Sequence, residues 1–343
     1  MTQQLTTAWA RYFPGVAVAS AVALAASFIA ERYGAPAMLM GLLLGMAFHF
    51  LNETPRVGPG LELVAVKALR MGVALLGLRL TLADVASLGW TPILLVISAV
   101  LATLLFGVVL ARVLGCDRQL GVLTGGSVAI CGASAAMAIS SVLPKGPDTQ
   151  RQTLFTIIGV TSLSTIAMVL YPIIGDVLQF NEKEMGIFIG ATIHDVAQVV
   201  GAGYSVSPAT GDLGTFIKLL RVAMLVPVVL MIGIIFRNKA SAAANREKAP
   251  AIPLFLIGFI ALFALNIPGL VPEGLGQPIA SLAPVLLLLA IAALGIRTSM
   301  QEVMTIGLKP VLLIVGETLF IAAIIVAYLL WITTELSRVD TPQ

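Results

Sequence analysis

The sequence predicts an all-α polytopic membrane protein with about eleven transmembrane helices, an inverted repeat and at least one discontinuous helix. Three observations predict this fold. The chain of 343 residues is 59% hydrophobic and 11% charged, with a mean hydropathy of +1.02, which is far above the range of water-soluble domains. Apolar windows of about 20 residues, the length that spans a bilayer, recur along the chain. Two of the hairpins between these windows repeat each other in sequence.

The apolar windows are continuous rather than alternating, which favours helices over a transmembrane barrel. We expect one transmembrane transporter domain over residues 1–343, with a linker loop at 237–250 between the eighth and ninth helices. The first window lacks a convincing cleavage site after it, so we expect it to be retained. The predicted spans are 14–30, 35–51, 61–80, 90–114, 119–143, 153–178, 184–204, 214–236, 251–267, 279–297 and 305–331.

Basic residues predict the orientation, because short loops rich in Lys and Arg stay in the cytoplasm. The linker "RNKASAAANREK" carries four basic residues and one acid. Counting spans outward from it gives a cytoplasmic N-terminus and an external C-terminus, with eleven basic residues at cytoplasmic ends and five outside. The net charge of +3 therefore reports topology and gives no reason to expect nucleic acid. Cys116 and Cys131 fall at or inside spans, so no disulfide is expected.

The stretches "LGLRLTLADVASLGWTPILLV" from Leu76 and "LGIRTSMQEVMTIGLKPVLLI" from Leu294 align without a gap and share eight identities, including Arg79 with Arg297. The spans that they join differ by seven, an odd number, so one copy is inverted relative to the other. Inverted repeats are typical of secondary transporters. The alternative is that "GLR" is a generic motif at helix ends. On the repeat, Arg79 and Arg297 should lie at opposite ends of the fold.

The fifth span, "QLGVLTGGSVAICGASAAMAISSVL", is rich in glycine and small polar residues. A Gly-Gly pair weakens a helix by roughly 1 kcal/mol per Gly relative to Ala. A broken helix there would point free N–H groups at an anionic substrate. The alternative is close helix packing through small residues, for which Gly121 and Gly125 have the four-residue spacing. We expect an interruption between Gly125 and Gly132. The residues expected near a central cavity are Gly125, Gly126, Ser127, Cys131 and Ser134.

The seventh span places His194 and Asp195 side by side near its middle, and Gln198 shares the helical face of His194 four residues later. Ionisable groups in a bilayer core are costly and usually face a cavity or a partner. The pair could bind a coupling proton or line a substrate site. The structural alternative is that it only joins this helix to a neighbour.

Further charges lie inside other spans. We expect Arg221 to be deep enough to bind an anion, while Lys218 reaches the membrane surface through its long side chain. Glu317 lies mid-way through the last span, and its expected partner is Arg221, a cation or a proton. Lys67 and Arg70, near a cytoplasmic end, are expected to reach the surface as well.

The blocks "GLRLT", "GGSVAICGASAAMA", "IGATIHDVAQVVGAGYSVSP", "KLLRVAMLVPVV" and "AALGIRT" resemble the YeiH-type family of bacterial inner-membrane proteins, which carry the label of sulfate exporters. The resemblance runs from about residue 60 to 320, and Asp195 stands where members often have Glu. It implies an inner-membrane location and membership of the cation/proton-antiporter and anion-transporter superfamily, whose inverted-repeat fold has crossing discontinuous helices.

The leading hypothesis is a secondary transporter that exports a small anion, sulfate or a sulfonate-like compound, coupled to a proton or sodium gradient. The alternative is a proton- or sodium-coupled cation antiporter that uses Asp195 and Glu317, and a channel is a more distant one. The chain has two histidines and neither HExxH nor GxSxG, so we expect no enzyme. We expect no cofactor and no metal. The expected partners are the lipid bilayer, the anion, the coupling ion and, in a homodimer, a second copy of the chain.

Overall fold

The computed structural model describes residues 2–79, 86, 89–144, 148–236, 254–267, 273–298 and 308–339. Within these residues the regular structure is helical throughout, which confirms the predicted all-α class. The predicted linker at 237–250 lies outside the described residues.

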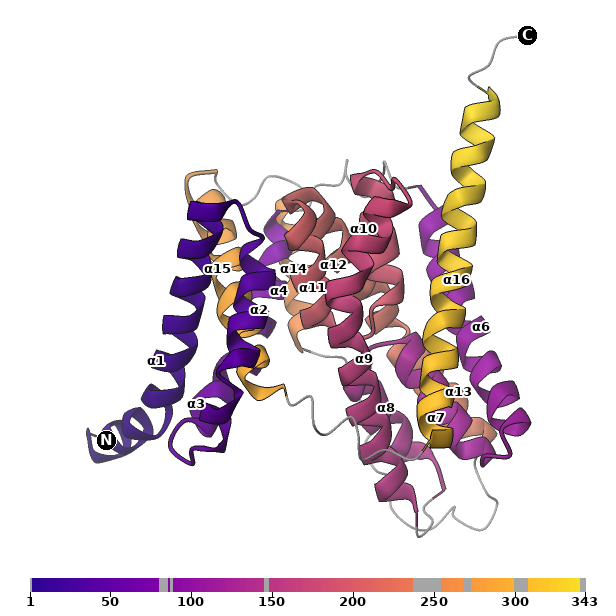
Figure 1. Ribbon diagram of the computed structural model, residues 1–343, viewed down its shortest axis with the longest axis horizontal. Helices are drawn as coiled ribbons and strands as arrows, with labels where there is room; N and C mark the ends of the chain where they lie inside the picture. Colours follow the sequence, from indigo (N-terminus) through magenta and orange to yellow (C-terminus); the bar gives the residue numbers. More distant parts are fainter. Residues whose placement is uncertain are drawn as a thin grey trace.

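The helices form two bundles that lie side by side (Figure 1). The first bundle contains α1 (Thr2–Tyr33), α2 (Ala37–Ala47), η1 (His49–Glu53), α3 (Gly58–Leu63), η2 (Val64–Ala68), α4 (Leu69–Leu75), η3 (Leu76–Leu78), α14 (Leu254–Asn266) and α15 (Glu273–Arg297). The second bundle contains α6 (Thr91–Val113), α7 (Arg118–Ala129), α8 (Ala133–Val142), α9 (Thr149–Val177), α10 (Glu182–Thr192), α11 (Val196–Val206), α12 (Pro208–Ala223), α13 (Leu225–Ile235) and α16 (Leu308–Val339).

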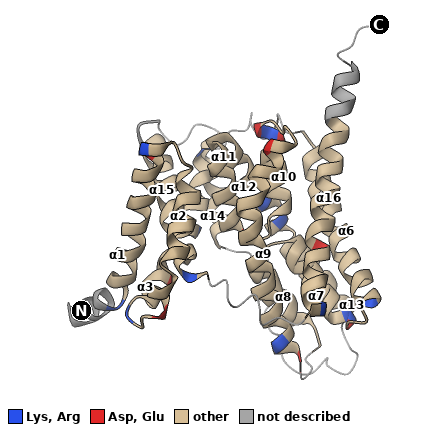
Figure 2. Ribbon diagram, viewed as in Figure 1, with Lys and Arg blue, Asp and Glu red and all other residues tan. Residues whose placement is uncertain are grey.

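In the described part of the chain, six helical segments are long and apolar enough to cross a membrane, by length and composition; α12 and α13 together form one of them. They also expose large apolar side chains, such as Leu105, Ile173 and Ile234. Charged side chains gather mainly at the two ends of the molecule and leave an apolar band between them (Figure 2). An exposed apolar band of this kind requires contact with lipid. The chain is therefore a membrane protein.

The fifth predicted span folds back on itself. α7 ends at Ala129, and α8 begins three residues after Ile130 in the opposite direction. Ile139, seven residues past Gly132, packs directly against Gly126, six residues before it. Two helices in line could not make this contact, because they would separate these residues by roughly 20 Å at 1.5 Å per residue. We call α7 and α8 hairpin 1.

The seventh predicted span folds back in the same way, as the contacts of its two helices with α12 show. Gly186 of α10 lies against Leu213, and Gly190 lies against Ile217, so α10 runs parallel to α12. Gly203, near the end of α11, lies against Gly211, and the earlier Val199 lies against the later Gly214, so α11 runs antiparallel to α12. We call α10 and α11 hairpin 2. Hairpin 2 occupies the upper part and hairpin 1 the lower part of the second bundle in Figure 1.

The prediction that spans 119–143 and 184–204 each cross the membrane is therefore wrong. Hydropathy windows count apolar residues and do not register a reversal of the chain. The open end of each hairpin lies at one end of the second bundle, and the two hairpins begin from opposite ends (Figure 1). The predicted total of about eleven crossings falls accordingly, although both segments are discontinuous, as was expected of at least one helix.

The break in hairpin 1 lies at residues 130–132 and not at the Gly125–Gly126 pair, which α7 passes through without interruption. Gly125 and Gly121 instead allow α7 to approach Gly107 of α6 at backbone contact. The reversal itself uses Gly132, whose φ of 62° is in the left-handed region that favours glycine.

Arg79 and Arg297 lie at opposite ends of an antiparallel helix pair, as the inverted repeat requires. α4 and α15 run antiparallel, since Gly72 packs against Leu287 while Val66 and Leu294 line a common pocket. Arg79 follows η3 at one end, and Arg297 ends α15 at the other. Residues 80–85 and 299–307 of the two copies lie outside the described residues, so the repeat as a whole stays a prediction.

The hairpin topology predicts which residues share a membrane face. Single cysteines at Asp117 and Ser141, the exposed ends of hairpin 1, should react with a membrane-impermeant maleimide from the same face. Cysteines at Lys183 and Ala209, beside the ends of hairpin 2, should react from the other face. The background is Cys116→Ser with Cys131→Ser. Labelling of positions 117 and 141 from opposite faces would show that this segment crosses the membrane, and would contradict the hairpin.

Candidate functional site

The tips of the two hairpins meet in the middle of the second bundle. The tips are so close that a Cβ at Gly132, at the tip of hairpin 1, would lie 3.7 Å from the Cβ of His194 at the tip of hairpin 2. The reversals expose the last carbonyls of α7 and α10, because no following turn of helix supplies their usual N–H donors. Away from water, each such carbonyl needs another donor.

Lys218 of α12 supplies donors to both tips. Its Nζ donates to the carbonyl of Ile130 in hairpin 1 at 2.7 Å and to the carbonyl of Ile193 in hairpin 2 at 2.9 Å. The side chain is fully buried. One ammonium group therefore joins the two reversals.

Arg221, one helical turn further along α12, makes four more bonds to the same region. Nε and one terminal nitrogen donate to Ala129 and Val128 of hairpin 1, at 2.8 and 2.6 Å. The other terminal nitrogen donates to Ile193 and Gly190 of hairpin 2, at 2.9 and 3.2 Å. The C-terminal ends of α7 and α10 carry partial negative charge, so the two cations also complement the helix dipoles.

These contacts correct two expectations. Lys218 does not reach the membrane surface but is buried at the centre of the second bundle. The guanidinium of Arg221 is occupied by carbonyls and makes no ion pair with Glu317. The spacing of three residues on α12 was the available signal, because it puts both cations on one face of the helix.

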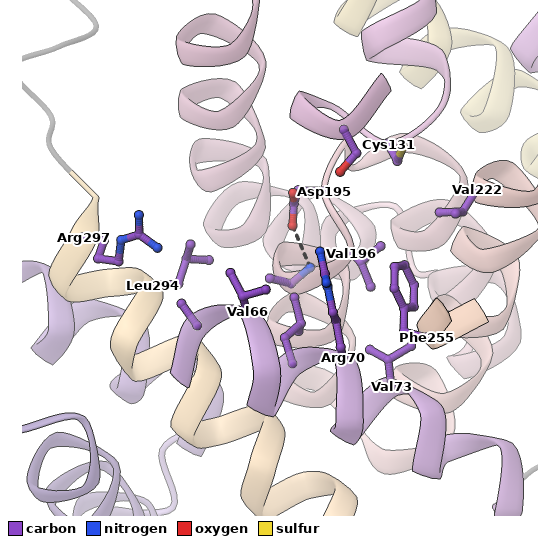
Figure 3. Close-up of a pocket in the computed structure, with 14 residues that line it drawn as sticks. Val66, Arg70, Val73, Cys131, Asp195, Val196, Val222, Phe255, Leu294 and Arg297 are labelled. Carbon is purple, nitrogen blue, oxygen red and sulfur yellow. Dashed lines mark hydrogen bonds between the residues drawn. The ribbon is translucent and has the colours of Figure 1, made fainter. Parts of the chain in front are cut away.

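A pocket of about 230 Å³ lies where the hairpin tips face the first bundle. The tips contribute Cys131, Ser134 and Asp195, and the first bundle contributes Arg70 of α4 and Arg297 of α15. Figure 3 shows the two arginines approaching from one side and Asp195 and Cys131 from the other. The π-helical turn η2 adds to the wall through Ala65 and Val66, and such turns are frequent at functional sites.

The charged groups of this pocket are not paired with one another. Across the described part of the chain, Arg70 and Arg297 form no hydrogen bond or ion pair, and Asp195 forms no ion pair. Asp195 caps α11: its Oδ1 accepts the backbone N–H of Ala197 at 2.8 Å. Arg70 was expected only to reach the surface. That it and Arg297 line one pocket could not be predicted, because they are far apart in the chain.

The predicted site residues of hairpin 1 lie in two different environments. Cys131 and Ser134 line the pocket, at the tip and in the first turn of α8. Ser127 is buried in α7, where its hydroxyl donates to the carbonyl of Leu123. Gly125 and Gly126 face α6 and α8 and do not line the pocket.

His194 and Gln198 do not share a helical face, because the break separates them. The Nε2 of His194 lies 2.9 Å from the hydroxyl of Thr318 on α16. The amide nitrogen of Gln198 donates to Thr165 of α9 at 3.4 Å. His194 Nδ1 and Gln198 Oε1 are buried without a hydrogen-bond partner. His194 therefore faces away from the pocket that contains Asp195, and only Asp195 of the three predicted residues lines it.

Glu317 lies outside the pocket, between α16, α6 and α7. Its side chain is fully buried, and Oε1 lies 2.8 Å from the hydroxyl oxygen of Thr124. Oε2 has no partner. Of the ten predicted site residues, the structure brings Cys131, Ser134 and Asp195 to the pocket, places Arg221 behind the tips, and puts the remaining six elsewhere.

A family profile described as conserved hypothetical protein 698 matches residues 14–314. The chain is 48% identical over 317 residues to the UPF0324 membrane protein TauZ of Paracoccus pantotrophus, covering 92% of this chain and 94% of the relative. It is 47% identical over 324 residues to a UPF0324 membrane protein of Chlorobaculum tepidum, covering 94% and 90%. It is 49% identical over 326 residues to one of Rhizobium meliloti strain 1021, covering 95% and 94%. No solved structure matches.

Replacing Lys218 should destabilise the fold. Lys218→Met removes the side-chain donor of the buried Ile130 carbonyl, at about 1–3 kcal/mol, while the Ile193 carbonyl keeps its bond from Arg221. We expect the free energy of unfolding in detergent micelles to fall by about 1–3 kcal/mol. Lys67→Met, at an exposed lysine of η2, is the matched control and should change it by less than about 0.5 kcal/mol. Equal losses in the two variants would contradict the role given to Lys218.

Proposed function

We infer that this chain, which belongs to the family described as conserved hypothetical protein 698, is a secondary transporter for a small anion such as sulfate or a sulfonate. The same match confirms the family resemblance read from the sequence. We propose that a proton or sodium gradient drives the transport and that the anion binds in the pocket at the hairpin tips.

The observation that carries this proposal is the charge of the pocket. Arg70 and Arg297 face it without protein partners across the described part of the chain, and Asp195 is the one acid among its lining residues. The first turns of α8 and α11 also line it, and helix N-termini carry partial positive charge. A pocket of about 230 Å³ holds an ion of the size of sulfate rather than a large metabolite.

The arrangement of the bundles supports alternating access. Arg79, from the first bundle, forms an ion pair with Asp212 of α12 in the second bundle at 3.2 Å. Tyr204 donates its hydroxyl proton to the same carboxylate. This contact joins the bundles near the open end of hairpin 2, whereas the pocket lies at the hairpin tips. Because the ion pair joins the bundles on one side of the pocket, the arrangement supports a carrier rather than a continuously open channel.

A cation antiporter is the second candidate, because Asp195 and Glu317 are acids within the membrane-spanning part. The two carboxyl groups do not meet, since Glu317 lies outside the pocket and binds Thr124. The unpaired arginines beside Asp195 repel a cation. We therefore favour the anion.

The hairpins also support the proposed orientation, with the N-terminus in the cytoplasm of a bacterial inner membrane and the C-terminus outside. If each hairpin returns to its own side, Lys145 and Arg151 move to the cytoplasmic side and Lys183 moves outside. The balance of basic residues then changes from eleven against five to twelve against four, which follows the positive-inside rule more closely.

Flux into proteoliposomes tests the function. Labelled sulfate should exchange across the membrane, and unlabelled sulfate or an organic sulfonate should compete with it. Arg70→Gln and Arg297→Gln should each raise the KM for sulfate about tenfold or more, because each removes a hydrogen bond between charged groups. Lys67→Gln, a nearby lysine outside the pocket, is the control. Unchanged KM values in both arginine variants, or exchange of cations only, would contradict an anion site here.

A further inference from the structure

We propose that the anion and a proton on Asp195 occupy the pocket together, so that the protein carries them in the same direction. The inference rests on the proposed function and concerns the sign of its coupling. Asp195 is placed for this role because its carboxylate shares one pocket with the two unpaired arginines.

The charged groups around Asp195 come from α4, α12 and α15. Arg70 of α4 and Arg297 of α15 face it across the pocket. Lys218 of α12 lies behind it and donates to the carbonyl of Ile193, two residues before it. Arg221 donates to the same carbonyl.

The remaining neighbours of Asp195 are polar or uncharged. Ser164 of α9 accepts its backbone N–H at 3.1 Å, and Cys131 lines the pocket beside it. His194 precedes it and faces Thr318. Among the residues that line the pocket, Asp195 is the sole acid.

One oxygen of Asp195 is available for a proton. Oδ1 is engaged as the cap of α11, with the N–H of Ala197 at 2.8 Å, whereas Oδ2 has no hydrogen-bond partner among the described residues. A proton can bind Oδ2 from water on one side of the membrane and leave from the same atom on the other side. No bond other than this O–H forms or breaks.

The charge balance sets the sign of the coupling. With Asp195 ionised, the pocket presents two positive side chains and one negative; with Asp195 protonated, it presents two positive side chains alone. A dianion binds the second state more tightly, because an ionised carboxylate in the same pocket repels it at close range. Coupling between two ligands is reciprocal, so the bound dianion holds the proton by the same factor.

Two ligands that raise each other's affinity are bound at the same time, so they cross the membrane in the same direction. An exchanger would need the proton and the anion to compete for the pocket, and the charges on its walls oppose competition. A proton gradient directed into the cell would then drive the anion inward. This differs from the export expected from the sequence, which would require an outward gradient of the anion itself.

Equilibrium binding to the purified wild-type protein gives the first test. Sulfate remains a dianion between about pH 6 and pH 8, so only the protein changes charge. We expect sulfate to bind about tenfold or more tightly at pH 6 than at pH 8. Binding that is equal at the two pH values, or tighter at pH 8, would overturn the co-transport proposal but leave the anion site. A lack of sulfate and sulfonate binding at both pH values would overturn the proposed function itself.

Two variants assign the pH dependence to Asp195. Asp195→Asn imitates the protonated carboxyl, so its affinity for sulfate should be high and equal at pH 6 and pH 8. Glu62→Gln, at an exposed acid of α3 outside the pocket, should keep the wild-type dependence. A pH dependence that survives in Asp195→Asn would assign it to another group and overturn the role of Asp195.

Proteoliposomes test the direction. An imposed pH gradient with the acid side outside should accelerate uptake of labelled sulfate, and sulfate added to one side should carry protons with it, as reported by an internal pH dye. Exchange of labelled for unlabelled sulfate at equal pH is measured in parallel, because it depends on the anion site alone. Movement of sulfate toward the acid side would indicate antiport and contradict the proposal.

Discussion

The fold depends on two buried cations that hold the ends of two reversed helices. A chain that turns back inside a membrane leaves helix carbonyls without donors, and lipid supplies none. Lys218 and Arg221 together give six hydrogen bonds to these carbonyls, from both hairpins. Their positive charges also face the negative ends of α7 and α10. Each cation is stabilised by the reversals, and each reversal by the cations.

The same reversals create the pocket. When α7 and α10 point their negative ends at Lys218 and Arg221, α8 and α11 begin on the side that faces the first bundle, with their positive ends toward it. The first bundle adds Arg70 and Arg297 at that place. The positive character of the pocket thus has two sources, one from each bundle. A relative movement of the bundles would separate these sources, and the Arg79–Asp212 contact would have to adapt to it.

Composition and apolar windows predicted the helical membrane fold, because burial in lipid is a property of each segment alone. Polar residues in apolar windows predicted that His194, Arg221 and Glu317 would be buried. The hairpins could not be predicted this way, since a helix that crosses and one that turns back have the same hydropathy. The role of Lys218 was missed because its partners are backbone carbonyls. Its spacing from Arg221 puts both cations on one face of α12 but does not show what that face binds. Arg70 and Arg297 are 227 positions apart, and only packing brings them together.

The hydroxyl of Thr124 explains why Asp195 rather than Glu317 is the better candidate for a changing charge. That hydroxyl lies 2.9 Å from the carbonyl of Leu120 and 2.8 Å from Glu317 Oε1, yet it has one proton to donate. If Glu317 carries a proton, it donates to Thr124, and Thr124 donates to Leu120, so both contacts are hydrogen bonds. If Glu317 is ionised, one contact is lost, and a buried charge remains without a cation beside it. Glu317 is thus suited to stay neutral, whereas the ionised Asp195 keeps its cap on α11 and the arginines across the pocket.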